Sequence, residues 1–206
     1  MDTLTKSPAP TYGVPPSLGN SRRPPVSDRA LEIPEPAERE RVTMPDGRTL
    51  ILREIYAGDV VALQRGFARL SPEEVRMRFL HPLNELPHDF AVRLCDLDPQ
   101  TGVAFVLIDL PDAPDREIRG VARAHVDPTT LAAEFALVVQ HQYTGRGLGA
   151  RLMRHLTAAC RERCATELWG DVLIDNGPML HLCAKLGFVR AHVPHDPGVQ
   201  RMTLAL

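Results

Sequence analysis

The chain has no long hydrophobic run and almost no excess of either charge. None of its apolar stretches approaches the ~18 residues that a helix needs to cross a bilayer. Its 24 basic and 26 acidic residues leave a net charge of −2, which offers nothing to a nucleic acid or an anionic membrane surface. We therefore expect no membrane and no nucleic acid among its partners.

Cysteine is also scarce. Four cysteines in 206 residues, Cys95, Cys160, Cys164 and Cys183, do not make a disulfide framework. Cys160 and Cys164 lie four residues apart in one expected helix. Reduced, buried thiols are the favoured interpretation, and they suit a cytoplasmic protein. His192 and His195 have no cysteine pair beside them, so we expect no metal site.

The first 47 residues lack aromatic side chains except Tyr12, and they hold nine of the 19 prolines. Such a segment buries too little apolar surface to offset the entropy of ordering it. We expect a largely disordered tail over residues 1–47, either passive or serving as a docking arm, followed by one domain over 48–206. The export signal suggested by Ser21-Arg22-Arg23 is excluded, because no apolar stretch follows it.

The remainder alternates strand-like and helix-like patterns. Ser71 and Glu74 form a capping box, which marks one helix start. Hydrophobic spacing and turn residues predict strands at 48–56, 102–110, 117–126, 132–139, 167–173, 188–193 and 200–206, and helices at 58–70, 71–81, 87–95, 148–163 and 176–186. The order predicts an α+β domain whose mixed central sheet is flanked by helices.

The most informative segment runs from Phe135 to Gly149. It reads as an apolar strand, a polar connector, a glycine turn and the start of a helix. A turn of this kind lets backbone N–H groups converge on a phosphate without side chains in the way.

Two common phosphate motifs fit this turn poorly. A nucleotide P-loop needs Lys and Ser/Thr after its last glycine, whereas Ala150 and Arg151 stand there. Gly145, Gly147 and Ala150 match the dinucleotide fingerprint, but that motif follows its strand at once, and here five residues separate Val139 from the first glycine. The remaining pattern is Gln/Arg-x-x-Gly-x-Gly/Ala.

Gln142, Gly145 and Gly147 match that third pattern, which resembles the acyl-CoA pyrophosphate loop of the GNAT N-acetyltransferases. The segment from Asn176 to Phe188, ending in Leu-Gly-Phe, is similar to the fourth helix of that family. More narrowly, residues 67–74, 78–82 and 133–136 resemble the acetyltransferase domain of bacterial protein lysine acetyltransferases. The resemblance as a whole covers about 48–206.

The resemblance implies a GNAT-like acyl-CoA N-acyltransferase fold and transfer of an acetyl group from acetyl-CoA, as co-substrate, to an amine. The implied acceptor is a protein lysine, for example one on an acyl-CoA synthetase. Two alternatives stay open: an acetyltransferase for a small amine, such as a polyamine or aminoglycoside, and a non-catalytic module that senses acyl-CoA.

Direct attack by a lysine amine requires a base, because an amine with a pKa near ~10.4 is protonated at neutral pH. Glu134 is the candidate, since it stands at the head of the strand that leads to the glycine turn. The resemblance assigns the general base to the glutamate of Ala133-Glu-Phe-Ala136. The residues alone also allow a solvated strand glutamate without a role.

Ten residues are expected to bind the co-substrate: Val138, Val139, Gln142, Thr144, Gly145, Arg146, Gly147, Leu148, Gly149 and Asn176. N–H groups of 144–149 would hold the pyrophosphate, and the two valines would pair through their main chain with the pantetheine arm. Arg146 either contacts a phosphate or faces solvent, and Gln142 either bonds a phosphate or braces the turn. Asn176 is expected to cap its helix, with a possible cofactor contact.

Many relatives carry a tyrosine general acid on the fourth helix, where this chain has Cys183. A packed core cysteine and an acid to the leaving thiolate are the two interpretations, of which the core role is favoured. His125 and His141 flank the expected site as possible proton relays or as surface residues. Trp169, the single tryptophan, is expected in the core.

Overall fold

The computed structural model describes residues 40–192 and 196–206. Tyr12, the Ser21-Arg22-Arg23 segment, the possible docking arm and His195 therefore lie outside the described residues. No helix in these two ranges is long and apolar enough to cross a membrane.

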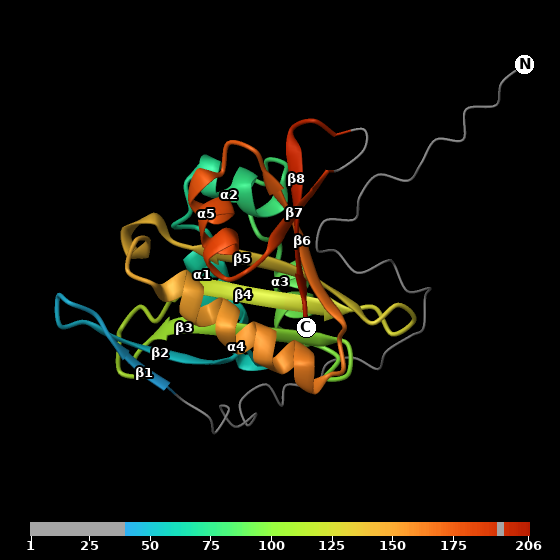
Figure 1. Ribbon diagram of the computed structural model, residues 1–206. Coiled ribbons are helices and arrows are strands. Elements are labelled where there is room, and N and C mark those ends of the chain that lie inside the picture. Colours follow the sequence, from blue (N-terminus) through green and yellow to red (C-terminus); the bar gives the residue numbers. More distant parts are fainter. Residues whose placement is uncertain (1–39, 193–195) are drawn as a thin grey trace, which may run out of the picture.

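Strands and helices follow in the predicted order (Figure 1). The strands are β1 Glu40–Thr43, β2 Thr49–Glu54, β3 Gly102–Asp109, β4 Ile118–Val126, β5 Ala132–Val139, β6 Glu167–Leu173, β7 Val189–His192 and β8 Val199–Ala205. The α-helices are α1 Val60–Phe67, α2 Pro72–Phe79, α3 His88–Cys95, α4 Leu148–Glu162 and α5 Gly177–Lys185, with 3-10 turns η2 Ala57–Asp59 and η3 His141–Tyr143.

All eight strands form one mixed sheet in the order β1-β2-β3-β4-β5-β6-β8-β7. Every neighbouring pair is antiparallel except β5 and β6, which are parallel and joined by α4. This confirms the predicted α+β architecture, including the hairpin of β3 and β4 and the single strand–helix–strand crossover.

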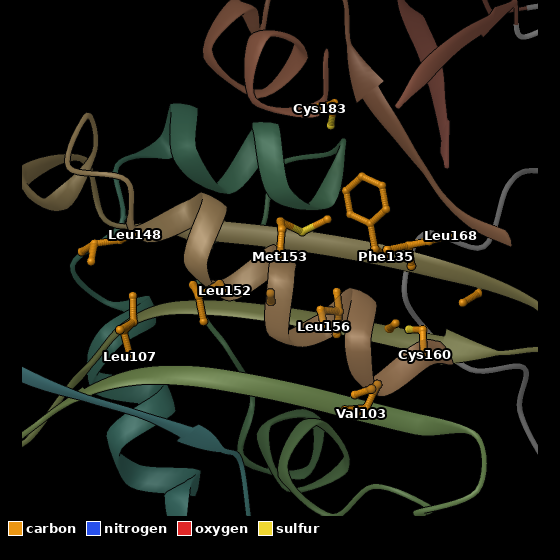
Figure 2. Packing of buried hydrophobic residues seen from close by; sticks show 14 of the residues in the cluster. Val103, Leu107, Phe135, Leu148, Leu152, Met153, Leu156, Cys160, Leu168 and Cys183 are labelled. Atoms are coloured by element: carbon orange, nitrogen blue, oxygen red, sulfur yellow. The ribbon is translucent and has the colours of Figure 1, made fainter. Parts of the chain in front are cut away.

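The sheet has a core on each face. α4 packs on one face through Leu152, Met153 and Leu156, none of which is exposed, and Figure 2 shows these side chains directed at the strands. α1 and α3 cover the other face (Figure 1). Successive side chains of the central strands therefore point alternately into the two cores.

The start of the domain differs from the prediction. Residues 40–47 were expected to belong to the tail, but β1 pairs with β2, and Val42 and Met44 are 5% and 4% exposed. The reason is the alternation of these two apolar residues with polar ones, a strand pattern that the proline count obscured. The turn predicted at 44–47 is present, with Gly47 at a φ of 84°.

Candidate active site

The sheet opens between β5 and β6. These strands pair over only three residues, from Ala132 opposite Glu167 to Glu134 opposite Trp169. Beyond that point β6 and β8 turn away from β5, and α2 and α5 lie beside the opening (Figure 1). The edge of β5 after Glu134 therefore presents main-chain groups that β6 does not pair with.

The glycine turn follows that edge. Gly145 and Gly147 adopt φ values of 72° and 77°, a region that glycine enters without strain, and a Cβ at either would meet nothing within 4 Å. Gly147 is the N-cap of α4. The first N–H groups of a helix have no intrahelical acceptor, so those of α4 are available to an anion. Gly145 and Gly147 are therefore required by their positive φ values and not by a lack of room for a side chain.

Gly149 has a different reason to be glycine. A Cβ there would lie 3.2 Å from Leu182 Cδ2 and 3.4 Å from Leu137 Cδ2. The missing side chain lets α4 approach α5 and β5 closely, next to the opening of the sheet.

A cavity of about 600 Å³ lies over the glycine turn, the free edge of β5 and α5. Its walls include eight of the ten expected co-substrate residues: Val138, Val139, Thr144, Gly145, Gly147, Leu148, Gly149 and Asn176. The structure thus gathers residues from β5, α4 and α5 around one cavity, although they span almost 40 positions of sequence.

Gln142 and Arg146 are not among the residues that line this cavity. The Gln142 side-chain amide donates to Gln140 Oε1 at 3.1 Å, which braces the start of the turn. Arg146 forms an ion pair of 3.1 Å with Asp46, in the turn between β1 and β2. Both side chains secure the loop from outside.

Asn176 caps α5, as expected, by accepting a hydrogen bond of 3.2 Å from Met179 N. Two further side chains of this helix, His181 and Lys185, line the same cavity. The sequence analysis did not single them out. Their spacing of four residues, which places them on one helix face with Pro178 and Met179 nearby, was the available signal.

Helix α2 supplies residues that the sequence analysis also missed. Met77 and Arg78 line the cavity together with Glu74. The predicted capping box is present, with Glu74 accepting from Ser71 N at 2.7 Å and donating its own N–H to Ser71 Oγ at 3.2 Å. The second carboxylate oxygen of Glu74 accepts from His141 N at 2.6 Å, so the cap also ties α2 to the glycine turn.

Glu134 stands where the sheet opens and is partly buried. It lines a narrow passage of about 40 Å³ together with Arg78 and Asn176, both of which also line the larger cavity. It also lines a second cleft of about 590 Å³ on the side of α3. Glu134 therefore lines both the narrow passage and the second cleft, and the passage shares Arg78 and Asn176 with the larger cavity.

The second cleft combines aromatic and charged groups. Phe90 and Trp169 line it, as do Arg93, Arg123 and Asp127. The backbone N–H groups of Thr129 and Thr130 donate to the Asp127 carboxylate and hold its pKa below the usual range, so it is an anion at neutral pH. His125 also lines the cleft, directly opposite Glu134 in the β4–β5 register.

Trp169 is not a core residue, contrary to expectation. Its neighbour Leu168 is fully buried beneath α4, and successive strand side chains point to opposite faces. Trp169 consequently faces the cleft and is only partly buried, and the Arg201 guanidinium stacks 4.0 Å from its ring centroid.

Cys183 belongs to the core. It is 0% exposed in the cluster around α4, and burial raises the pKa of its thiol to about 12. Figure 2 shows it above Phe135, between α5 and the sheet. Cys95 and Cys160 are buried as well, whereas Cys164 is exposed at the end of α4, contrary to the expectation that all four thiols are buried. A thiol so reluctant to ionise is a poor proton donor.

The sequence is similar to those of known acetyltransferases. The profile of the Acetyltransferase (GNAT) family matches residues 66–188, more than half of the chain. The chain belongs to the GNAT acetyltransferase family. It is 31% identical to Acetyltransferase PA5475 from Pseudomonas aeruginosa, over 75% of this chain and 82% of that protein. A segment of 46 residues is 41% identical to the streptothricin acetyltransferase of Streptomyces lavendulae, covering 22% of this chain and 24% of that enzyme.

Solved structures agree with the fold. The GNAT domain of S. lividans PAT superposes with a TM-score of 0.73 at 24% identity, over 84% of this chain and all of that domain. A GCN5-related N-acetyltransferase from Kribbella flavida gives 0.59 at 22% identity, covering 76% of this chain and 98% of the other. This GNAT protein therefore has the acyl-CoA N-acyltransferase fold of its family and is an acyltransferase that uses an acyl-CoA. In its described residues, no group of three or more His, Cys, Asp or Glu side chains is placed to hold a metal ion.

Proposed function

We propose that this GNAT enzyme transfers the acetyl group of acetyl-CoA to the side-chain amine of a protein lysine, with Glu134 as the general base. The observation that carries the proposal is the position of Glu134 at the last paired residue of β5 and β6, where it lines the second cleft and the narrow passage next to the larger cavity. A carboxylate there can take the proton of an amine that attacks a thioester arriving from the other side.

In this proposal, acetyl-CoA lies across the cavity of about 600 Å³ with its pyrophosphate on the N–H groups at the start of α4. The pantetheine arm pairs with the unpaired edge of β5 at Val138 and Val139, as an added strand would. Lys185 and His181, exposed on α5, lie at the wall of the same cavity and supply positive or neutral donors to the phosphates.

The second cleft fits a lysine side chain. Phe90 and Trp169 offer apolar surface to its methylene stem, while Asp127 and Glu134 offer negative charge to its ammonium. The cleft reaches the surface at His125 and at the exposed turn 127–130. A side chain that projects from a folded protein can therefore enter it, and the segments that resemble lysine acetyltransferases favour the same acceptor.

A small cationic amine is the second candidate. It is supported by the same carboxylates and by the short segment shared with the streptothricin acetyltransferase, whose name states a small-molecule acceptor. The two candidates differ in the product, which mass spectrometry separates. Incubation of the protein with labelled acetyl-CoA and a cell lysate should label protein lysines, and label on small amines alone would contradict the lysine proposal.

Substitution Glu134→Gln tests the base. At neutral pH the variant should lose about 10²- to 10⁴-fold in turnover, because the amide cannot accept the amine proton. The defect should shrink as pH rises toward the lysine pKa of ~10.4, since more of the amine is then already neutral. Turnover against pH is the measurement, with CoA affinity measured by calorimetry alongside.

Glu162→Gln is the matched control, because Glu162 is an exposed glutamate at the end of α4, on the other face of the sheet. It should leave both the rate and its pH dependence unchanged. A Glu134→Gln variant with wild-type turnover at neutral pH would refute Glu134 as the base. Tight CoA binding without any transfer in the wild-type protein would instead identify an acyl-CoA sensor.

A further inference from the structure

Acyl transfer leaves a negative charge that the residues considered so far do not stabilise. When the amine attacks the thioester carbon, the charge forms on the carbonyl oxygen and then leaves with the CoA sulfur. The tyrosine that serves many relatives is replaced by Cys183, which is fully buried in the core and does not line the co-substrate cavity. The sulfur can leave as a thiolate without that acid, and a cation beside it would stabilise the charge.

Arg78 is placed where donor and acceptor meet. It lines the co-substrate cavity, the narrow passage that contains Glu134, and a small apolar cavity of about 50 Å³ beneath α2. Arg123, from β4, lines that small cavity and the second cleft. No other arginine in the described ranges lines both the co-substrate cavity and the passage at Glu134.

Arg78 remains positively charged at neutral pH in its partly buried surroundings. Burial, together with the nearby positive charge of Arg123, lowers the pKa of Arg78 to about 9, while the Glu134 carboxylate raises it. It is therefore still a cation at neutral pH, in a partly buried place where charge interactions are stronger than in water. A further anion arriving between β5 and α2 would be stabilised by it.

The other charged and titratable groups near the passage either have partners or lie outside it, so Arg78 is the candidate to stabilise an anion there. On β6, Asp171 is held by Arg201 of β8 in a two-pronged ion pair of 2.8 Å. On β4, Arg123 donates to the Leu94 carbonyl at 3.1 Å. The remaining titratable groups that line the co-substrate cavity are on α2, α5 and the turn after β5: Glu74, His181, Lys185, His141 and Tyr143. Of these, none also lines the passage at Glu134.

We propose that Arg78 is a catalytic residue whose guanidinium stabilises the negative charge on the CoA sulfur as the thioester bond breaks. This inference rests on the acyl transfer proposed above. The amine nitrogen forms the new amide bond, Glu134 takes the amine proton, and the carbon–sulfur bond breaks with its electron pair remaining on sulfur. The thiolate is held beside Arg78 until it takes a proton from solvent, which completes free CoA.

The decisive experiment titrates the thiol of CoA bound to the full-length protein, followed by the ultraviolet absorbance of the thiolate. Bound CoA should have a thiol pKa about 1–2 units lower in the wild-type protein than in Arg78→Met, because an opposite charge within a few ångströms favours the ionised form. Arg78→Lys keeps the charge and should restore part of the shift. An equal thiol pKa in wild type and Arg78→Met, both saturated with CoA, would overturn the proposal.

Two variants separate this inference from the proposed base. Glu134→Gln should lose transfer while the bound thiol keeps its low pKa, so a failure of the base assignment leaves the titration interpretable. Arg76→Met is the matched control on the same helix, since Arg76 is partly exposed and pairs with Glu73 and Asp175. It should change neither the thiol pKa nor turnover.

In steady-state kinetics Arg78→Met should lower kcat by about a hundredfold, as removal of one preorganised charge-stabilising donor does elsewhere, with a smaller effect on the KM for acetyl-CoA. Circular dichroism and CoA affinity verify that the variant is folded. An Arg78→Met enzyme with unchanged kcat would contradict the catalytic role even if the titration moved.

Discussion

Arginine side chains lie in two kinds of surroundings in this molecule. Arg53 and Asp59 lie at 1% and 2% exposure and neutralise each other through two hydrogen bonds of 2.7 Å. Arg78 and Arg123 are partly buried, and the loss of hydration lowers their pKa values to about 9 and about 10. The first pair is structural, whereas the second places cationic charge beside the proposed reacting atoms.

Asp59→Ala should destabilise the fold by about 3–5 kcal/mol, because it removes the carboxylate that neutralises a buried guanidinium. It also removes the acceptor of the Tyr56 N–H, at 3.1 Å. Urea unfolding followed by circular dichroism measures the change. Glu73→Ala removes the exposed partner of Arg76 and should leave the free energy of unfolding nearly unchanged. Equal losses in both variants would contradict the distinction.

At the scale of elements, the glycine turn and α2 build the co-substrate cavity from opposite sides. The turn supplies N–H groups at the start of α4, and α2 supplies Met77 and Arg78. Glu74 connects them by capping its own helix and accepting from His141 N. Ser71 and Glu74 thus do more than start a helix, because Glu74 also ties α2 to the segment after β5.

Gly147→Ala should weaken CoA binding by roughly tenfold, since alanine at a positive φ costs about 1–2 kcal/mol and the loop relaxes away from the path that aims its N–H groups. Calorimetry with CoA measures this loss. Gly187→Ala is a matched control, because Gly187 also has a positive φ, of 88°, but does not line the cavity. It should lower stability and spare CoA affinity. Parallel losses of affinity would mean that only global strain is being measured.

At the scale of the whole molecule, the sheet consists of two parts that meet at a weak junction. β1–β5 and β6–β8 are joined by three residue pairs of β5 and β6, and by the α4 crossover. The cavity walls come from both parts, since β5 and α4 lie on one side and α5 on the other. A molecule bound there joins the two parts.

Saturating CoA should therefore raise the thermal midpoint. At a concentration of 100 times Kd the stabilisation is about 2.7 kcal/mol if only the folded state binds. Differential scanning fluorimetry across a CoA series measures it, and pantetheine, which lacks the pyrophosphate, should give a smaller shift. A midpoint that is the same with and without saturating CoA would contradict binding at this cavity.

The sequence alone determined most of the fold. Strict hydrophobic periods predicted the strands and helices from residue 48 onward, and the Ser71 cap and the Asn176 cap are present as predicted. β1 was missed because its four residues carry a short pattern inside a proline-rich region. The glycine spacing predicted a glycine turn, and Gly145 and Gly147 there have positive φ values, which are a local property of the backbone.

Only the tertiary structure decided which side chains meet. Arg78 is distant in sequence from Glu134 and lines the same narrow passage, because α2 lies beside the opening of the sheet. Trp169 faces the second cleft and Cys183 the core because strand alternation and helix packing assign their faces, which residue type does not reveal. Local physics fixed the elements and the glycine turn. Long-range packing placed Arg78, Glu134 and two cavities close to one another.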